Sequence, residues 1–315
     1  MALYQSDKGK QVAFQMNAPY SLNPKTDTTI ALIEEAHLRG YKIWWYPVSS
    51  LYWRDALVRA RMQPLSFIPE ATHWCSLGEA IDMPLAQMNA VWMRQDPPFD
   101  MSYITATHLL EHAGTAVYNS PQGVRNAPEK LSSLYFSEFM PKTLISSDAE
   151  TIHAFAAQCS TVVAKPLYGY GGRSVFKFTI GDGNLDTFLE LHNESSREPL
   201  MWQQFLPEVR DQDRRILLIG GQVKAVFGRT PMEGSIRANM RVGGTPMACE
   251  LTAQQEKICA AIAPMLKAQG LLVVGLDVIG DYLTEINVTS PTGFRAAQKL
   301  YGVNLAAKTW DAIGL

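Results

Sequence analysis

The sequence predicts an α/β protein that begins with a parallel, helix-covered sheet and continues into further subdomains. Three observations lead to this prediction. A chain of 315 residues is too long for one hydrophobic core. It opens with a strand, a helix and a strand in succession. Blocks in which short strands alternate with helices then follow.

The opening strand-helix-strand unit comprises three short segments. Residues 12–16 are an apolar run typical of a buried strand, and residues 28–39 carry apolar side chains at near-helical spacing before Gly40. Residues 42–46 supply the second strand. Further elements of this first domain, which we expect to end near residue 128, are strands at 90–93 and 116–118 and a helix at 103–113.

The remaining chain predicts two smaller blocks. The first has a helix at 129–139, strands at 161–164, 174–178 and 200–204, and a helix at 186–192. The second has strands at 215–219 and 223–227, a long loop at 230–244, a helix at 253–269 and a hairpin near 271–288.

That hairpin is the most informative stretch. Pairing across a three-residue turn, Gly280 to Tyr282, places Asp277 opposite Glu285. Because side chains alternate along a strand, Asn287 shares their face, while the other face is uniformly apolar. Opposed carboxylates repel each other unless a cation or a proton intervenes. Mg²⁺ prefers such hard oxygen ligands. We therefore predict a Mg²⁺ site, the alternative being a solvated face with accidental charges.

A lysine and a glycine-rich turn predict a phosphate site. Lys165 ends a buried strand, and Gly169, Gly171 and Gly172 follow, where backbone N–H groups can approach a phosphate closely. The turn matches neither a Walker loop nor a dinucleotide fingerprint. Lys130 opens a predicted helix, where the helix dipole disfavours a cation, so we expect it to serve a ligand. Surface lysines beside a tight turn are the alternative.

Other polar segments are weaker candidates. Arg215 opens a strand two residues after Asp213. It is a candidate partner for a phosphate or an acyl phosphate, and a surface ion pair is the alternative. The loop at 230–244 is long enough for a lid, although it could be an ordinary disordered loop. Residues 94–100 follow a strand end, the usual ligand position in an α/β sheet, although a rigid proline turn explains them nearly as well.

Composition excludes several classes. With 28 basic and 30 acidic residues and a net charge of -2, nucleic acid is a poor partner. The N-terminus lacks a signal-peptide stretch and no apolar run approaches a membrane span, so we expect a cytoplasmic protein without a membrane partner. The four cysteines are scattered, which argues against zinc and disulfides and favours reduced thiols.

The chain resembles the bacterial glutathione synthetases over almost its whole length after the first ten residues. The matching motifs are RQDPPFD at Arg94, NSPQGVRNAPEKL at Asn119, AKPLYGYGG at Ala164, WQQFLPEVRDQDRR at Trp202 and VGLDVIGDYLTEINVTSPTG from Val274. This resemblance implies an ATP-grasp fold behind an N-terminal Rossmann-like (pre-ATP-grasp) domain, divided at 1–128, 129–200 and 201–315. It implies a carboxylate-amine ligase that joins γ-glutamylcysteine to glycine.

The resemblance also implies roles for individual residues. It places ATP against Lys130, Lys165, Gly169, Gly171, Gly172, Gln203, Gln204, Phe205, Leu206 and Asp213. It assigns Mg²⁺, with Mn²⁺ as an alternative, to Asp277, Glu285 and Asn287. It puts Arg215, Arg237 and Asn239 near the acyl phosphate and the lid, and Arg94, Asp96, Arg229, Ser290, Pro291 and Thr292 at the peptide substrate. The family also suggests a homo-oligomer, a tetramer.

Two positions depart from the family pattern, and two rival functions stay open. Tyr168 stands where some members have Asp, and Arg173 where small residues are common, which leaves the geometry of the glycine loop open. One rival is an ATP-grasp ligase that adds glutamate or D-alanine. The other is a nucleotide-binding regulatory protein without turnover.

Overall fold

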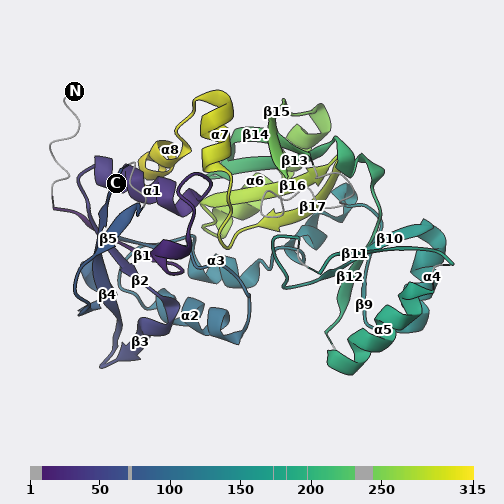
Figure 1. Cartoon of the computed structure of the whole chain (residues 1–315), viewed down its shortest axis with the longest axis horizontal. Helices are drawn as coiled ribbons and strands as arrows, with labels where there is room; N and C mark the ends of the chain where they lie inside the picture. The colour runs from purple at the N-terminus through teal and green to yellow at the C-terminus, as the bar shows by residue number, and fades with distance from the viewer. Residues whose placement is uncertain (1–8, 70–72, 173, 182, 197, 231–243) are drawn as a thin grey trace.

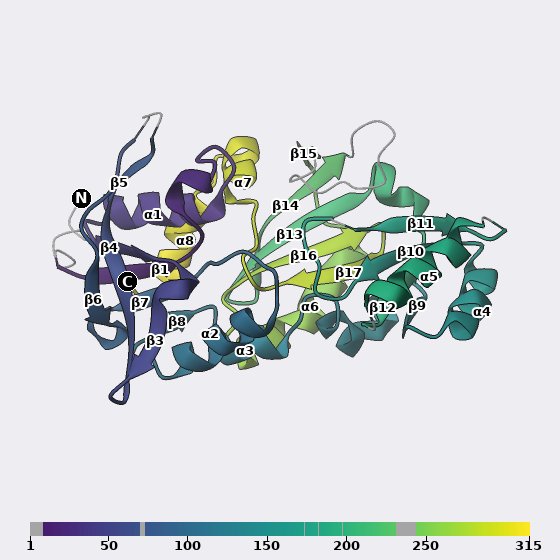
Figure 2. The same ribbon diagram turned by 60° about the horizontal axis from the view of Figure 1, so that its bottom comes forward.

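The computed structural model describes residues 9–69, 73–172, 174–181, 183–196, 198–230 and 244–315. Its three sheets follow one another along an elongated molecule (Figure 1). The N-terminal sheet lies at one end, a five-stranded sheet in the middle and a four-stranded sheet at the other end, as the turned view in Figure 2 also shows. None of the helices in the described ranges combines the length and the apolarity that crossing a membrane requires.

The N-terminal sheet contains the predicted parallel unit. β1 (Gln11–Gln15) pairs in parallel with β2 (Lys42–Tyr46), and α1 (Thr28–Leu38) connects them. On its other side β1 pairs in parallel with β7 (Ala90–Met93), which pairs with β8 (Val117–Tyr118). The helices α2 (Met101–Glu111) and α3 (Pro121–Asn126) precede and follow β8.

An antiparallel extension, which the sequence patterns did not predict, widens this sheet. Its strands β3, β5 and β6 all pair with β4, which joins the sheet through β2. Side chains of β4 alternate, so Val58, Ala60 and Met62 are buried. The strands are β3 (Leu51–Arg54), β4 (Leu57–Phe67), β5 (Cys75–Leu77) and β6 (Ile81–Pro84).

The four-stranded sheet is antiparallel in the order β11-β10-β12-β9. The helices α4 (Ala149–Cys159) and α5 (Asn184–Ser195) supply apolar side chains that pack with its Trp202 in one core. The strands are β9 (Thr143–Ser146), β10 (Thr161–Pro166), β11 (Phe176–Thr179) and β12 (Leu200–Gln204). The strand predicted at 174–178 therefore begins two residues later.

The helix predicted at 129–139 is wrong in type. Residues Ser132–Phe139 form two 3₁₀ pieces that meet at Phe136, whose backbone is not helical. Carbonyl oxygens at the start of an α-helix must accept from residues four positions on. Here Glu129 O accepts from Ile286 N (3.0 Å) and Lys130 O from Ser133 Oγ (2.5 Å). Other short 3₁₀ turns are Pro19–Ser21, Val48–Ser50, Leu85–Gln87 and Pro207–Arg210.

The five-stranded sheet is antiparallel in the order β15-β14-β13-β16-β17. The helix α6 (Ala253–Ala268) packs Ile258, Ile262 and Leu266 into one core with Leu276 and Val278. The strands are β13 (Asp213–Ile219), β14 (Gln222–Thr230), β15 (Thr245–Ala248), β16 (Val273–Ile279) and β17 (Tyr282–Asn287).

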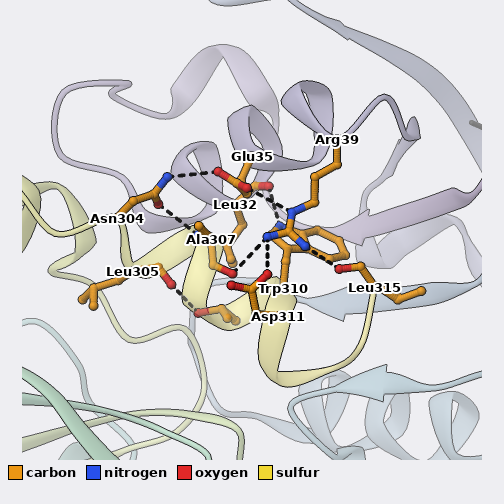
Figure 3. A network of polar contacts seen from close by, with 10 residues as sticks. Leu32, Glu35, Arg39, Asn304, Leu305, Ala307, Trp310, Asp311 and Leu315 are labelled. Carbon is orange, nitrogen blue, oxygen red and sulfur yellow. Dashed lines mark hydrogen bonds and ion pairs between the residues drawn. The ribbon is translucent and has the colours of Figure 1, made fainter. Parts of the chain in front are cut away.

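The last two helices, α7 (Phe294–Tyr301) and α8 (Leu305–Ala312), return to the N-terminal domain. Trp310 is fully buried against Phe14, Tyr41 and Trp92. Figure 3 shows the polar network beside it, centred on Arg39. The Arg39 guanidinium lies 3.0 Å from Glu35, 2.6 Å from Asp311 and 2.5 Å from the carbonyl oxygen of Leu315. This network fastens α8 to α1.

Candidate active site

A cleft lies between the four-stranded and the five-stranded sheet. The four-stranded sheet and the turn after β10 contribute a lysine, glycines and apolar side chains, and the five-stranded sheet contributes charged ones. We call this space the nucleotide cleft. Predicted residues that line it are Lys130, Lys165, Gly169, Gly171, Gly172, Gln203, Gln204, Phe205, Leu206, Asp213, Arg229, Asp277 and Glu285.

Strand alternation explains how the charged residues come to face the cleft. On β13, Ile216 and Leu218 belong to the core that contains α6. Asp213 and Arg215 therefore point to the opposite face. Arg229 lies on β14, which pairs with β13, and its guanidinium contacts both Asp213 and Asp277.

The hairpin of β16 and β17 places Asp277 opposite Glu285, as predicted. The predicted three-residue turn is wrong, because Ile279 pairs with Tyr282 across a two-residue turn. A bulge after Asp277 compensates by leaving Thr284 as the extra residue on β17. The Thr284 hydroxyl donates to the Asp277 carbonyl oxygen (3.0 Å), which fixes the bulge.

Both carboxylates of the hairpin are held by cations. The guanidinium of Arg215 spans Asp277, with Nε 2.7 Å from Oδ1 and Nη2 3.1 Å from Oδ2. Burial opposes ionisation of Asp277, but Arg215 and Arg229 outweigh burial and hold the pKa of this carboxyl below its usual value. Lys130 Nζ lies 3.0 Å from Glu285 Oε1 and donates to Gly169 O (2.6 Å).

Lys165 extends from β10 into the cleft and donates to Gln203 Oε1 (2.6 Å). Burial lowers the pKa of Lys165 to about 8, because its surroundings replace water around the ammonium group. The Gln203 amide in turn donates to Thr143 Oγ1 (3.1 Å), which orients its oxygen toward the lysine. The cleft thus presents an ordered ammonium group. A phosphate oxygen can bind it by taking the place of the Gln203 oxygen.

The residues of the predicted metal site fit a hard cation. Among the described residues no three His, Cys, Asp or Glu side chains form a metal-binding group. The donor set is instead two carboxylates and an amide, which suits a Mg²⁺ ion that keeps water and phosphate oxygens. Within the described chain, Asp277 Oδ1 is buried and lacks a hydrogen bond despite its ion pairs. Asn287 Nδ2 donates to Gly275 O (3.2 Å), so its amide oxygen points away from that strand.

The glycine loop makes contact with the N-terminal domain. Gly171 and Gly172 adopt positive φ angles of 64° and 72°, which side chains disfavour. Tyr168 stacks on Phe99 with ring centroids 6.1 Å apart. Tyr168, one of the two positions that depart from the family pattern, therefore connects the glycine loop to the segment after β7. Arg173 lies outside the described residues.

A second, larger cavity adjoins the nucleotide cleft, and we call it the substrate cavity. It has a volume of about 610 Å³, within the range of small-molecule sites. Arg229 and Glu285 line both spaces, so the two meet there. Other predicted residues that line the substrate cavity are Asp96, Arg215, Asn287, Ser290, Pro291 and Thr292.

Arg94, predicted as a substrate residue, lies beneath this cavity. Its side chain is 5% exposed, and its guanidinium donates to Thr29 Oγ1 and to Pro291 O, both at 3.0 Å. Arg94 therefore supports the loop that carries Pro291. The predicted lid residues Arg237 and Asn239 lie outside the described residues.

Glu129 is a site residue that the sequence analysis missed. Its Oε1 accepts hydrogen bonds from Val288 N (3.0 Å), Thr289 N (3.1 Å) and Thr289 Oγ1 (2.8 Å). Burial, and then the charge of Glu285, raise the pKa of Glu129. It lines the substrate cavity and fixes the chain directly after Asn287. Its position directly before Lys130 was the available signal.

Comparisons with known proteins bear on the family of this chain. The model of the prokaryotic glutathione synthetase N-terminal domain matches residues 11–125, and that of the prokaryotic glutathione synthetase ATP-grasp domain matches residues 129–302. The glutathione synthetase of Brucella melitensis is 44% identical over 96% of this chain and 98% of its own length. That of Shewanella oneidensis is 42% identical over 93% of this chain and 94% of its own length.

Solved structures confirm the fold. The RimK domain protein ATP-grasp from Sphaerobacter thermophilus superposes with a TM-score of 0.65 at 18% identity, covering 96% of this chain and 98% of its own. The ATP-grasp ligase PsnB, in a complex with a phosphomimetic precursor variant, Mg and ADP, superposes with a TM-score of 0.60 at 18% identity, covering 97% and 98%. Two family models that together span most of the chain, and near full-length relatives above 40% identity, place this chain in the prokaryotic glutathione synthetase family.

Proposed function

We propose that the chain ligates γ-L-glutamyl-L-cysteine to glycine with cleavage of ATP, giving glutathione, ADP and phosphate. The meeting of the nucleotide cleft and the substrate cavity at Arg229 and Glu285 carries the proposal. The nucleotide cleft presents lysines and glycines that can bind phosphates, and the substrate cavity is large enough for a dipeptide. The name of the relatives, glutathione synthetase, supports the choice of substrates.

The reaction needs two steps, because a carboxylate is inert toward an amine in water. The cysteinyl carboxylate first attacks the γ-phosphorus, the bond from that phosphorus to the β-phosphate oxygen breaks, and ADP leaves. Lys130 and Lys165 oppose the charge of the transferring group, so positioning and electrostatics supply the catalysis. The neutral amine of glycine then attacks the acyl carbon, and inorganic phosphate leaves. Arg215 and Arg237 stabilise charge at that stage, and Asn239 acts with the lid.

The proposed metal site completes the charge balance. Asp277, Glu285 and Asn287 would hold Mg²⁺, which would neutralise phosphate oxygens when bound. Mn²⁺ accepts the same oxygen ligands and is proposed as a substitute. Lys130, Arg215 and Arg229 pair with the Asp277 and Glu285 carboxylates. The same cations would lie beside phosphate oxygens that a metal ion held by these carboxylates would help to neutralise.

The family resemblance supports three further proposals. They are a homotetrameric assembly, a cytoplasmic location and domains at 1–128, 129–200 and 201–315. Light scattering of the purified protein tests the first, cell fractionation the second and limited proteolysis the third.

The function is tested by ADP release from purified protein with Mg²⁺ and ATP. We expect release that requires both γ-glutamylcysteine and glycine, with glutathione identified by mass. Glutamate and D-alanine, offered as alternative amines, test the rival ligases. Release with one of them but not with glycine would contradict the proposal, and no release with any acceptor would favour the regulatory protein.

A further inference from the structure

The walls of the substrate cavity carry opposite charges away from its boundary with the nucleotide cleft. Asp27 and Asp96 come from the N-terminal domain, before α1 and after β7. Arg295 and Lys299 lie on α7. None of these four described side chains lines the nucleotide cleft. The cavity therefore offers both an acidic and a basic surface to the part of a substrate that is remote from the phosphates.

Asp27 caps α1 and lines the substrate cavity. Its Oδ1 accepts from Ile30 N (3.0 Å), and burial raises the pKa of the carboxyl. The nearby Arg94, whose guanidinium donates to Thr29 and Pro291, offsets part of this rise in pKa. A half-buried carboxylate that lines a cavity favours a cationic ligand group.

Arg295, on α7, is held in place by contacts with α1 and within α7. Its Nη2 lies 2.6 Å from Glu34 Oε2, while its buried Nε has no hydrogen-bond partner among the described residues. The start of α7 is itself anchored to α1, because Thr28 Oγ1 accepts from Gly293 N (3.1 Å) and Phe294 N (3.3 Å). The acidic and basic groups thus keep a set spacing.

We propose that these walls recognise the α-amino acid head of the γ-glutamyl group. Asp27 and Asp96 bind its α-ammonium group, and Arg295 and Lys299 bind its α-carboxylate. This inference rests on the proposed function. The cysteinyl carboxylate must reach the boundary at Arg229 and Glu285 to be phosphorylated, so the opposite end of the dipeptide occupies the remote part of the cavity.

This arrangement distinguishes a γ-glutamyl from an α-glutamyl linkage. In the γ-linked dipeptide the ammonium and the carboxylate sit on the same terminal carbon. In the α-linked one, two methylenes separate the free carboxylate from the carbon that bears the ammonium. Walls of fixed spacing therefore select the γ-linked substrate.

Two substrate analogues test the proposal. Glutaryl-cysteine lacks the α-ammonium group, and 4-aminobutanoyl-cysteine lacks the α-carboxylate. With wild-type protein we expect KM for either analogue to exceed that for γ-glutamylcysteine by about tenfold or more, since each analogue lacks one of the two charged groups that the cavity walls bind.

Variants assign each charge to its wall. Asp27→Asn should raise KM about tenfold for γ-glutamylcysteine and 4-aminobutanoyl-cysteine, but not for glutaryl-cysteine. Arg295→Gln should raise KM for γ-glutamylcysteine and glutaryl-cysteine, but not for 4-aminobutanoyl-cysteine, and Arg295→Lys should restore part of the loss. Asparagine caps helices as well as aspartate does, so Asp27→Asn should keep its fold.

Asp148→Asn is the matched control. Asp148 caps α4 in the same way, accepting from Thr151 N (2.8 Å), but it lines neither cavity. Its KM values should stay at the wild-type level. Equal KM rises for parent and glutaryl-cysteine in Asp27→Asn, or wild-type protein that treats the analogues like the parent, would overturn the inference. Wild-type protein that releases no ADP with γ-glutamylcysteine and glycine would instead overturn the proposed function.

Discussion

Lys165 holds its ammonium group in a partly buried position in the nucleotide cleft, and its protonation should govern nucleotide binding. Its pKa of about 8 means that the side chain is charged below pH 8 and neutral above it. Phosphates need the charged form, so we expect Kd for ADP to rise as the pH increases through 8, approaching tenfold per pH unit. Titration calorimetry between pH 7 and 9.5 measures this. Lys165→Arg stays charged and should give a flatter profile, whereas a flat wild-type profile would contradict the assignment.

Glu285 is the carboxylate that faces both spaces. We expect Glu285→Gln to lower kcat by about 100-fold or more and to raise the Mg²⁺ concentration needed for half-maximal rate, because a neutral amide holds a divalent ion poorly. ADP release titrated with Mg²⁺ gives both values. Asp281→Asn, in the exposed turn of the same hairpin, is the control and should behave like wild type. Unchanged Mg²⁺ dependence in Glu285→Gln would remove Glu285 from the metal site.

At the scale of elements, β16 leaves room for the guanidinium of Arg215. A Cβ on Gly275 would lie 2.7 Å from Arg215 Nη1 and 3.2 Å from its Cδ. Gly275→Ala should therefore displace Arg215 from Asp277 and lower kcat by about tenfold or more, while the sheet persists. Steady-state kinetics with a thermal melt measures both. Gly183→Ala, where an added Cβ meets nothing within 4 Å, is the control. Wild-type kcat in Gly275→Ala would show that the position of Arg215 is unimportant.

The hairpin shows what the sequence can predict about an element. Alternation in β16 and β17 predicted the face that bears Asp277, Glu285 and Asn287, because a buried apolar face constrains the register. It did not predict the bulge at Thr284. A three-residue turn and a two-residue turn followed by a bulge both place Asp277 opposite Glu285. The segment 129–139 was predicted wrongly because β17 engages its carbonyl oxygen, a contact that no local pattern contains.

On the scale of the whole molecule, Arg39 ties the first helix to the last. We expect Arg39→Met to lower the free energy of unfolding by about 2 to 4 kcal/mol, because it leaves the buried Glu35 carboxylate without its cation. Urea unfolding measures the change. Arg54→Met removes a pair that is 59% exposed on the arginine side and should cost less than about 1 kcal/mol. Equal effects of the two variants would deny Arg39 a special role.

Long-range contacts limited the prediction of the site. The residues proposed to bind phosphate and metal lie in single strands or adjoining turns, so their neighbours in sequence were enough to suggest them. Arg94 was assigned to the substrate, yet its partner Pro291 lies 197 positions away, and only the assembled chain shows that it supports a loop. Asp27 was not singled out from the sequence, since the cavity that it lines is formed in part by α7, which is distant in sequence.

The seating of Trp310 among Phe14, Tyr41 and Trp92 also bears on how the protein is made. A ribosome releases the first strands long before it adds α8, although domains generally fold as they emerge. Until α8 has been synthesised, these aromatic rings remain exposed to solvent and can be bound by chaperones. A nascent chain that ends at residue 293 should therefore bind a hydrophobic dye that the finished protein ignores, and its N-terminal third should await the C-terminal helices before it becomes resistant to protease.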